Sequence, residues 1–209
     1  MKVLNADFIT SAARADGIPR DALPRIAMAG RSNVGKSSLI NALCGARIAR
    51  TSAAPGKTRL VNFYRVTLEG GPGGPGRWSA YLVDLPGYGY ARGGAESAAE
   101  LAVVAESYFA GDGATEVGRQ RRPLALHLVD SRHPGLPADR EAASWLAQRR
   151  VDCTLVATKI DKLSRSERTK NLKSLATIFA MPALPVSAES GEGMDELWRT
   201  IARQVRVAE

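Results

Sequence analysis

The octapeptide GRSNVGKS at residues 30–37 decides the fold of this 209-residue chain. It matches the pattern G-x-x-x-x-G-K-[ST], in which a glycine-bounded loop joins a strand to a helix. The mainly apolar run Arg25–Ala29 directly before it is typical of a strand. The apolar spacing after it predicts a helix over Ser37–Leu43 that ends before Gly45. The octapeptide therefore stands in the sequence context that a phosphate-binding loop requires.

The residues of this loop suit a chain of phosphates bound together with a metal ion. Its glycines let successive backbone N–H groups point at one anion, and the N-terminus of the following helix adds partial positive charge. Lys36 places a cation on the outer phosphates, and the Ser37 hydroxyl is a suitable ligand for Mg²⁺, which prefers oxygen donors. We therefore expect a nucleoside triphosphate with Mg²⁺ at this loop.

Strands and helices alternate along the rest of the chain. Strands are predicted over residues 25–29, 61–68, 78–83, 124–129, 153–157 and 184–186, and helices over 37–43, 95–109, 139–149, 166–179 and 195–205. Ser166 is expected to cap the helix that it begins. The Gly- and Pro-rich segment 69–77 makes a hairpin of two strands. This order predicts a three-layer α/β fold with a six-stranded, mostly parallel sheet, one antiparallel hairpin strand and helices on both faces.

Length and composition predict one domain of ordinary soluble type. We expect residues 1–209 to form it, with residues 1–23 as an N-terminal extension that packs on it. Cys44 and Cys153 stand far apart in the sequence, which favours two reduced thiols packed as small apolar groups. No apolar run approaches the ~18 residues of a membrane span, and Met1–Thr10 has no export signal. A cytoplasmic location without a membrane partner is expected.

The segment Asp84-Leu85-Pro86-Gly87 ends the second hairpin strand, one strand after the phosphate-binding loop. Ligands of such sheets bind at the carboxyl ends of the strands, where both segments fall. The Asp84 carboxylate can hold Mg²⁺ from the side opposite Ser37, through water. Gly87 lets its backbone N–H approach the γ-phosphate, so the chain that follows can respond to the presence of that phosphate.

Two later segments point to guanine as the base. Asp161, in TKID at residues 158–161, can accept hydrogen bonds from the N1–H and the 2-amino group of guanine, a donor pair that adenine lacks. The stem of Lys159 can lie along the base plane. Ser187-Ala188, after the last strand, can offer backbone N–H groups to the guanine O6. The predicted ligand is therefore GTP or GDP.

A threonine between the first helix and the strand at 61–68 can complete the Mg²⁺ shell when GTP is bound. Thr51, Ser52 and Thr58 all lie in this segment. Thr58 is preferred because Pro55-Gly56-Lys57-Thr58 stands immediately before the strand. An ordinary loop threonine is the alternative.

The chain is basic, with 29 Lys and Arg residues against 21 Asp and Glu residues and a net charge of +8. The positive charges gather in residues 31–68, which contain no acidic residue, in residues 119–122 and in residues 162–173. A basic domain often binds a polyanion, so RNA is a candidate partner. A merely solvated basic face is the alternative.

The four motifs GRSNVGKS, DLPG, TKID and SA, in this order, resemble those of the translation-factor-related GTPases. The finer resemblance is to the EngB family, also called YihA or YsxC, which are bacterial GTPases implicated in assembly of the large ribosomal subunit. It spans nearly the whole chain, and DLPGYGYA and PGKT are more specific than the phosphate-binding loop. The segments that carry it are AGRSNVGKSSLINAL at 29–43, TSAAPGKTRLVNFY at 51–64, DLPGYGYA at 84–91, DSRHPG at 130–135 and TKIDKL at 158–163.

The resemblance implies a GTPase that hydrolyses GTP to GDP and phosphate as a switch in large-subunit assembly, with a link to cell division. The implied partners are GTP, GDP and the large ribosomal subunit or its rRNA, without DNA, and the implied state is a monomer. Two alternatives are an RNA-binding protein that uses guanine nucleotide mainly for stability and a GTPase of tRNA modification. Arg25, Arg59 and the long hairpin tip depart from the family pattern, away from the nucleotide.

Two residues carry expectations about the rate of hydrolysis. Tyr88 follows D-x-x-G, where many GTPases have a glutamine that orients water, so slow intrinsic hydrolysis is expected. Asn33 stands where related GTPases use an asparagine to bind K⁺, so K⁺ or the ribosome is expected to stimulate hydrolysis. A hydrogen bond within the loop is the alternative for Asn33. His127, in an apolar strand, is expected to be a satisfied buried histidine, and His133 to lie on a loop near the ligand.

Catalytic roles are assigned to Lys36, Thr58, Gly87 and Asn33, and Mg²⁺ contacts to Ser37, Thr58 and Asp84. The residues expected to contact the nucleotide are Gly30, Arg31, Ser32, Asn33, Val34, Gly35, Lys36, Ser37, Ser38, Pro55, Gly56, Lys57, Thr58, Asp84, Leu85, Pro86, Gly87, Thr158, Lys159, Asp161, Lys162, Ser187 and Ala188.

Overall fold

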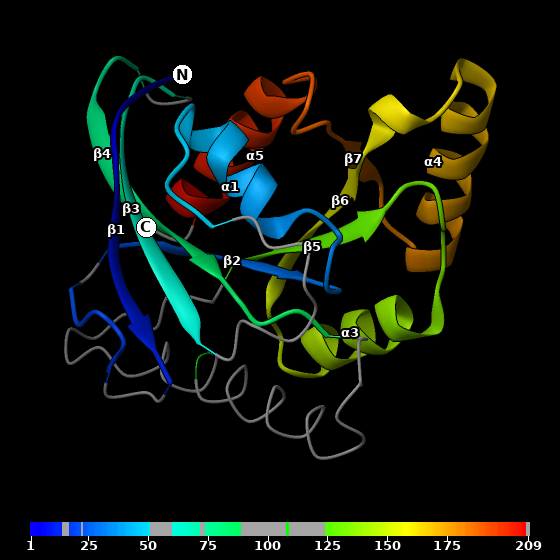
Figure 1. The fold of residues 1–209 in the computed structure, drawn as a ribbon, viewed down its shortest axis with the longest axis horizontal. Coiled ribbons are helices and arrows are strands. Elements are labelled where there is room, and N and C mark those ends of the chain that lie inside the picture. The colour runs from blue at the N-terminus through cyan, green and yellow to red at the C-terminus, as the bar shows by residue number, and fades with distance from the viewer. Residues whose placement is uncertain are drawn as a thin grey trace.

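The computed structural model describes residues 1–13, 17–21, 23–50, 60–71, 74–88, 108 and 124–207. In this part of the chain a seven-stranded sheet carries helices on both faces (Figure 1). The α/β fold predicted from the alternation of strands and helices is confirmed.

The described elements follow the predicted ones closely. The strands are β1 (Lys2–Ala12), β2 (Arg25–Gly30), β3 (Val61–Glu69), β4 (Arg77–Asp84), β5 (Leu124–Asp130), β6 (Asp152–Thr158) and β7 (Ala183–Pro185). The helices are α1 (Lys36–Cys44), α3 (Pro137–Gln148), α4 (Arg165–Phe179), α5 (Met194–Val207) and the short 3-10 helix η2 (Ile160–Lys162). Of the helix expected over residues 95–109, the structure describes Tyr108, which is helical.

The strands lie in the order β1-β3-β4-β2-β5-β6-β7. From β4 to β7 the neighbouring strands are parallel, whereas β3 is antiparallel to β4 and to β1. The predicted hairpin therefore exists, and its tip is closed by a 3.0 Å hydrogen bond from the N–H of Gly70 to the carbonyl of Gly76. The carboxyl ends of the parallel strands therefore lie at one edge of the sheet, where the ligands of such sheets bind.

Strand β1 is the one strand beyond the predicted six, and it lies within the expected N-terminal extension. It pairs with β3 over Lys2–Ala12, with register shifts between Val3 and Asn5 and between Phe8 and Thr10. Most of its side chains are exposed or half-buried on both faces, because it is the edge strand. Without a buried face its sequence lacks the apolar alternation that reveals a strand.

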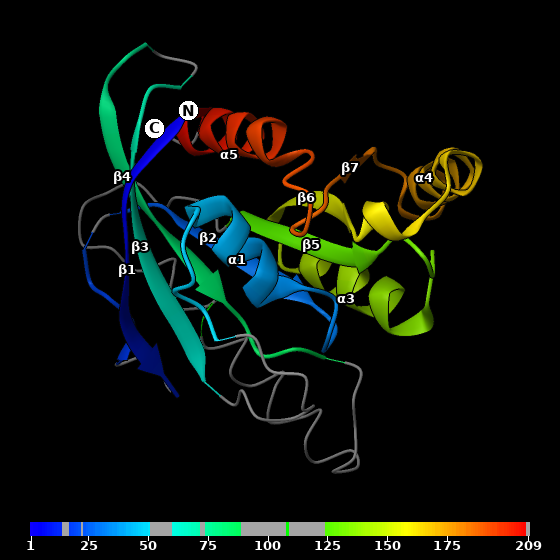
Figure 2. The same ribbon diagram turned by 45° about the horizontal axis from the view of Figure 1, so that its top comes forward.

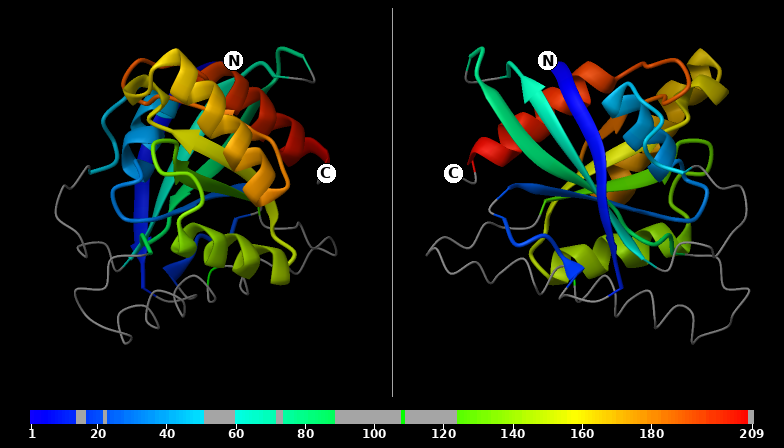
Figure 3. Two further views of the ribbon diagram at one scale, coloured as in Figure 1. Left: turned by 90° about the vertical axis from the view of Figure 1, so that its right-hand side faces the viewer. Right: turned by 60° about the vertical axis from the view of Figure 1, so that its left-hand side comes forward.

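Alternate residues of the strands pack into two separate hydrophobic cores, one on each face of the sheet. In β2, Ile26 and Met28 pack with α1 and α5, whereas Ala27 and Ala29 pack toward α3. On the face of α3, helix α4 buries Leu175 against β5 and β6. Figures 2 and 3 show α1 and α5 on one face of the sheet and α3 on the other. This two-faced burial explains why the strands read as nearly continuous apolar runs.

Two local predictions have different outcomes. Helix α1 ends at Gly45, whose φ of 62° is the left-handed conformation that glycine adopts readily, as expected. The cap assigned to Ser166 is wrong, because α4 begins one residue earlier and its N-cap is Ser164. The Ser164 hydroxyl accepts from the N–H of Glu167 while the Glu167 carboxylate accepts from the N–H of Ser164, which is a capping box.

Both cysteines are free thiols, and Cys44 lies in the core between α1 and the sheet. Burial raises the pKa of Cys44 to about 12, so this thiol stays protonated. Among the helices that the structure describes, we find none with the length and apolar character of a membrane span.

Candidate nucleotide site

The loop between β2 and α1 takes the shape of an anion cradle. Asn33 has a φ of 63° and Gly35 a φ of 110°, so the backbone reverses sharply before the helix. Gly30 is needed for space, since a Cβ there would lie 2.9 Å from the carbonyl oxygen of Leu128. Helix α1 has no side-chain cap and no acidic residue in its first turn. Its N-terminal amides are thus left for an external anion.

Lys36 places its ammonium group beneath this loop. Its Nζ donates to the carbonyl oxygens of Gly30 at 2.9 Å and of Arg31 at 3.1 Å. Burial lowers the pKa of Lys36, and the nearby Asp84 carboxylate opposes that shift. The ammonium group has three donors, so one remains for a phosphate oxygen once these two carbonyls are bound.

Asp84 and Ser37 meet on the other side of the loop. The Ser37 hydroxyl donates to Oδ2 of Asp84 at 2.8 Å. The second oxygen, Oδ1, is buried and has no hydrogen-bond partner among the described residues. Burial raises the pKa of Asp84, while Lys36 and Ser37 counter that effect. A buried carboxylate oxygen without a donor, next to a hydroxyl, fits the oxygen ligands that Mg²⁺ requires.

Gly87 brings the D-x-x-G segment into contact with the cradle. A Cβ at this position would lie 2.7 Å from Nζ of Lys36 and 2.8 Å from the backbone nitrogen of Ser32, so only glycine fits. The N–H of Ser32 donates to the carbonyl of Tyr88 at 3.0 Å, and its hydroxyl donates to the carbonyl of Gly87 at 3.3 Å. Leu85 and Pro86, between Asp84 and Gly87, are buried.

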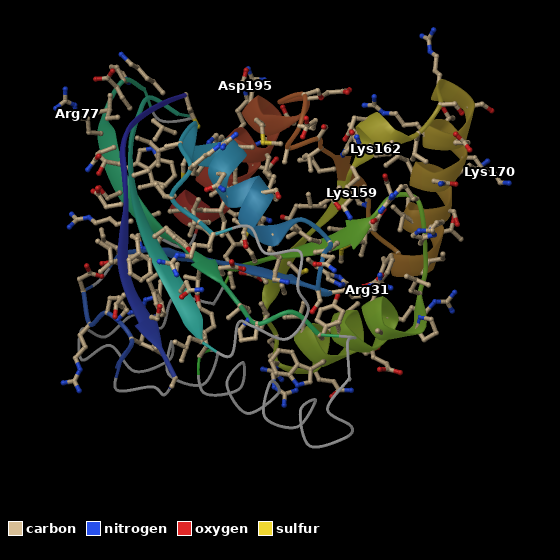
Figure 4. All side chains as sticks on the ribbon, viewed as in Figure 1. Arg31, Arg77, Lys159, Lys162, Lys170 and Asp195 are labelled. Carbon is tan, nitrogen blue, oxygen red and sulfur yellow. The ribbon has the colours of Figure 1, made fainter. Side chains whose placement is uncertain are left out.

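The TKID segment is bound to the same loop. The buried Thr158 hydroxyl lies 2.8 Å from the carbonyl oxygen of Val34 and 3.2 Å from that of Val129. Lys159 has a φ of 59°, and its Nζ donates to the carbonyl of Asn33 at 2.6 Å. Figure 4 places Lys159 and Arg31 at the same edge of the sheet. The elements that would hold phosphate and base are therefore one connected structure.

Asp161 is presented as a charged acceptor. Its Oδ1 accepts from the Ser187 hydroxyl at 2.7 Å, and its Oδ2 lies 3.1 Å from Nζ of Lys162. Burial alone would raise the pKa of Asp161, but the bonds from Ser187 and Lys162 outweigh it and lower the pKa. The N–H of Ser187 donates to the carbonyl of Glu192 at 2.9 Å, so the expected contact with O6 depends on Ala188.

The structure thus brings residues 30–37, 84–87, 158, 159, 161, 162, 187 and 188 of the predicted site together. Ser38 is exposed at the third position of α1. Pro55, Gly56, Lys57 and Thr58, together with the competing Thr51 and Ser52, lie outside the described residues. Their assigned contacts stay predictions.

Sequence reasoning missed Asp130 as part of the site. Its carboxylate accepts from Arg132 at 2.7 and 2.9 Å and from Nζ of Lys159 at 3.0 Å. Burial pulls the pKa of Asp130 upward, but these bonds bring it down to about 2. Its place in the chain could have indicated this role, because Asp130 is the last residue of β5 and pairs with Thr158, the last residue of β6.

His127 is a satisfied buried histidine, as expected, and its partner is Tyr88. The side chain is 1% exposed, and its Nε2 lies 2.9 Å from the Tyr88 hydroxyl. Burial lowers the pKa of His127 to about 4, so the ring is neutral at pH 7. His133 is exposed on the loop after β5. The Tyr88 contact was not predicted, because the two residues are 39 positions apart.

Comparisons with known proteins agree with this geometry. A protein-family model described as "50S ribosome-binding GTPase" matches residues 25–159. The chain is similar to probable GTP-binding proteins EngB from Solibacter usitatus (41% identity, 96% of both chains) and Pelotomaculum thermopropionicum (40%, 98% of both). The EngB protein of Shouchella clausii is 36% identical over the full length of both chains.

Solved structures match in fold. A variant of Era from Aquifex aeolicus bound to GDP and AlF4⁻ has a TM-score of 0.68 at 21% identity, over 87% of this chain and 56% of that one. A probable GTP-binding protein EngB has a TM-score of 0.58 at 21% identity, over 87% of this chain and 98% of that one. The fold of the sheet and its helices is thus shared with known GTP-binding proteins.

Proposed function

Because the chain belongs to the EngB family of GTP-binding proteins and is a GTPase, we propose that it acts as a GTP-controlled switch in assembly of the large ribosomal subunit. The observation that carries this proposal is the convergence of three motifs on one loop. Gly87 packs on Lys36 and Ser32, and Lys159 binds the carbonyl of Asn33. The segment proposed to sense the outer phosphate and the segment proposed to recognise the base therefore both contact the same loop.

Three groups of this chain are proposed to bind the triphosphate. The N-terminal amides of α1 and the ammonium group of Lys36 would take the β- and γ-phosphates, and the N–H of Gly87 would take a γ-phosphate oxygen. Mg²⁺, held by Ser37 and Asp84 and in the GTP form by Thr58, would neutralise phosphate charge. Lys36 and these amides would stabilise the charge that moves as the γ-phosphate leaves.

Guanine selection is assigned to Asp161. Its ionised carboxylate would accept from the N1–H and the 2-amino group, while Ser187 and Lys162 hold it in place. Adenine offers no matching donor pair, so ATP would leave this carboxylate unpaired at a cost that excludes it.

Helix α4 is proposed as the surface that meets ribosomal RNA. Its exposed Arg165, Lys170 and Lys173 have no carboxylate within ion-pair distance among the described residues. The one acidic residue of α4, Glu167, is used in the capping box. Arg165 and Lys170 also line an open hollow together with Ser166 and Thr169. Unpaired cations along one exposed helix suit the phosphate backbone of RNA.

The experiment that tests this function is co-sedimentation of the protein with purified large ribosomal subunits. Binding is expected with a non-hydrolysable GTP analogue and is expected to weaken with GDP, and GTP turnover is expected to rise when subunits are added. Equal binding with both nucleotides and unchanged turnover would favour an RNA-binding protein that uses nucleotide for stability. The cytoplasmic location, the monomeric state and the link to cell division stay predictions of the same proposal.

A further inference from the structure

Tyr88 follows the phosphate-sensing glycine directly, yet its side chain is turned toward α3 and β5. Its hydroxyl lies 2.9 Å from Nε2 of His127 on β5 and donates to Oδ1 of Asp139 on α3 at 3.1 Å. His127 and Asp139 are each 1% exposed. The hydroxyl of the residue that follows D-x-x-G therefore serves two buried polar side chains.

With Asp139 ionised, the hydrogen-bond roles of the three side chains follow from one another. Because the hydroxyl donates its one proton to Asp139, the neutral His127 ring donates to it through Nε2. Burial raises the pKa of Asp139, and the bond from Tyr88 and the charge of Arg31 counter that shift. Removing the hydroxyl would leave His127 and Asp139 buried without this hydrogen-bond partner. An unsatisfied buried polar group carries the full free-energy cost of its desolvation.

The backbone of Tyr88 is held as firmly as its side chain. Its carbonyl accepts from the N–H of Ser32 at 3.0 Å, and Arg31 and Tyr88 form an isolated parallel bridge. Arg31 also reaches Asp139, with 4.0 Å between Nε and Oδ1. Asp139 thus contacts both the phosphate-binding loop and the D-x-x-G segment, and Figure 4 shows Arg31 beside α3.

We infer that Tyr88 is a positioning residue for triphosphate recognition: its hydroxyl, docked between His127 and Asp139, fixes the Gly87–Tyr88 peptide against the phosphate-binding loop. The inference rests on the proposed role of Gly87 as the γ-phosphate sensor. This role of Tyr88 differs from that of a glutamine that orients water, because the Tyr88 hydroxyl is hydrogen-bonded to the buried His127 and Asp139. Of the loop amides, this docking uses the N–H of Ser32, and it places no side-chain cap on the N-terminus of α1.

The test compares Tyr88→Phe with Tyr81→Phe. Tyr81 is a matched control because it is also a tyrosine whose hydroxyl donates to an aspartate, Asp21, at 2.8 Å, and it lies within β4 away from the loop. Dissociation constants are measured for GDP and for a non-hydrolysable GTP analogue in Mg²⁺. Tyr88→Phe is expected to bind the analogue about 10-fold more weakly and GDP within about 2-fold of wild type. Tyr81→Phe is expected to leave the ratio of the two constants unchanged.

A second variant guards against a general loss of structure. Asp139→Asn keeps an acceptor for Tyr88 but removes its charge, so it is expected to lower the affinity for the analogue by less than Tyr88→Phe does. An unchanged ratio in Tyr88→Phe, an equal loss for GDP and analogue, or a gain in affinity for the analogue would each overturn the inference. Failure of the wild type itself to distinguish the analogue from GDP would instead overturn the role proposed for Gly87.

Discussion

Some side chains of this site form hydrogen bonds with two segments of the chain at once, and Asp130 is one of them. It holds the guanidinium of Arg132 from its own loop and the ammonium of Lys159, which directly follows β6. Lys159 in turn binds the carbonyl of Asn33 in the phosphate-binding loop. The TKID segment is therefore joined to the loop at residues 30–37 by a chain of charged hydrogen bonds, which are stronger than neutral ones.

Asn33 is the residue on which the K⁺ stimulation expected from the sequence depends. Its side chain has no hydrogen-bond partner among the described residues, which removes support for the alternative of a bond within the loop. Its φ of 63° suits glycine, so Asn33→Gly removes the amide without backbone strain. We expect wild-type GTP turnover to be faster in K⁺ than in Na⁺, and Asn33→Gly to turn over equally in both. Equal wild-type rates in the two salts would contradict this role.

The burial of His127 predicts a pH dependence of stability. The folded-state pKa of about 4 lies below the ordinary 6.5, so the unfolded chain binds more protons between these values. Stability is therefore lost as the pH falls from 6.5 toward 4, by about 2 kcal/mol between pH 7 and pH 5. The free energy of unfolding in urea at both pH values, for wild type and for His127→Leu, measures it. A variant that loses as much stability as wild type would show that other groups cause the decline.

At the scale of elements, periodicity predicted every described strand except β1. Strands β2 and β5 are buried on both faces and therefore stand out as apolar runs. Strand β1 has no such pattern, and backbone pairing with β3 holds it in place. The three site motifs were predictable because each carries its chemistry within a few consecutive residues. The contacts of Tyr88 with Asp139 and of Lys159 with Asp130 span 51 and 29 residues, and no local pattern reports them.

The corrected N-cap of α4 gives a prediction with an internal control. Ser164 accepts a hydrogen bond from the N–H of Glu167, whereas Ser166 lies inside the first turn. Ser164→Ala should therefore destabilise the protein by about 1 kcal/mol, the usual effect of a lost cap. Ser166→Ala should change the free energy of unfolding by much less, since alanine favours a helix interior. Chemical denaturation of both variants checks this, and equal effects would contradict the assigned cap.

Helix α4, with three exposed cations that have no ion-pair partner among the described residues, lies at the end of the sheet opposite β1 (Figures 1 and 4). On the other face of the sheet, Arg199 and Arg203 of α5 both pair with Glu196. The two helices therefore differ in the charge that is available to a polyanion, although both are rich in basic residues.

This difference predicts the salt dependence of ribosome binding. Lys170→Gln with Lys173→Gln should weaken binding to large subunits and reduce the slope of log affinity against log salt by about 1.5, since two phosphate contacts are lost. Arg199→Gln with Arg203→Gln removes the same charge from paired residues and should change the slope little. Sedimentation at several salt concentrations measures both. Equal slopes for the two double variants would contradict the assignment of RNA binding to α4.

The packing of α5 has an optical consequence. Trp198 is 4% exposed, donates through Nε1 to the carbonyl of Leu43 at 3.0 Å, and meets the Trp78 ring edge-on with 6.4 Å between centroids. Two of the three indoles of the chain thus form one pair between β4 and α5, and Trp145 lies on α3 with Arg149 stacked on it. Loss of the packing of α5 would expose this pair and shift the intrinsic fluorescence to the red, so in a Trp145→Phe variant the emission would report on this one layer of the protein.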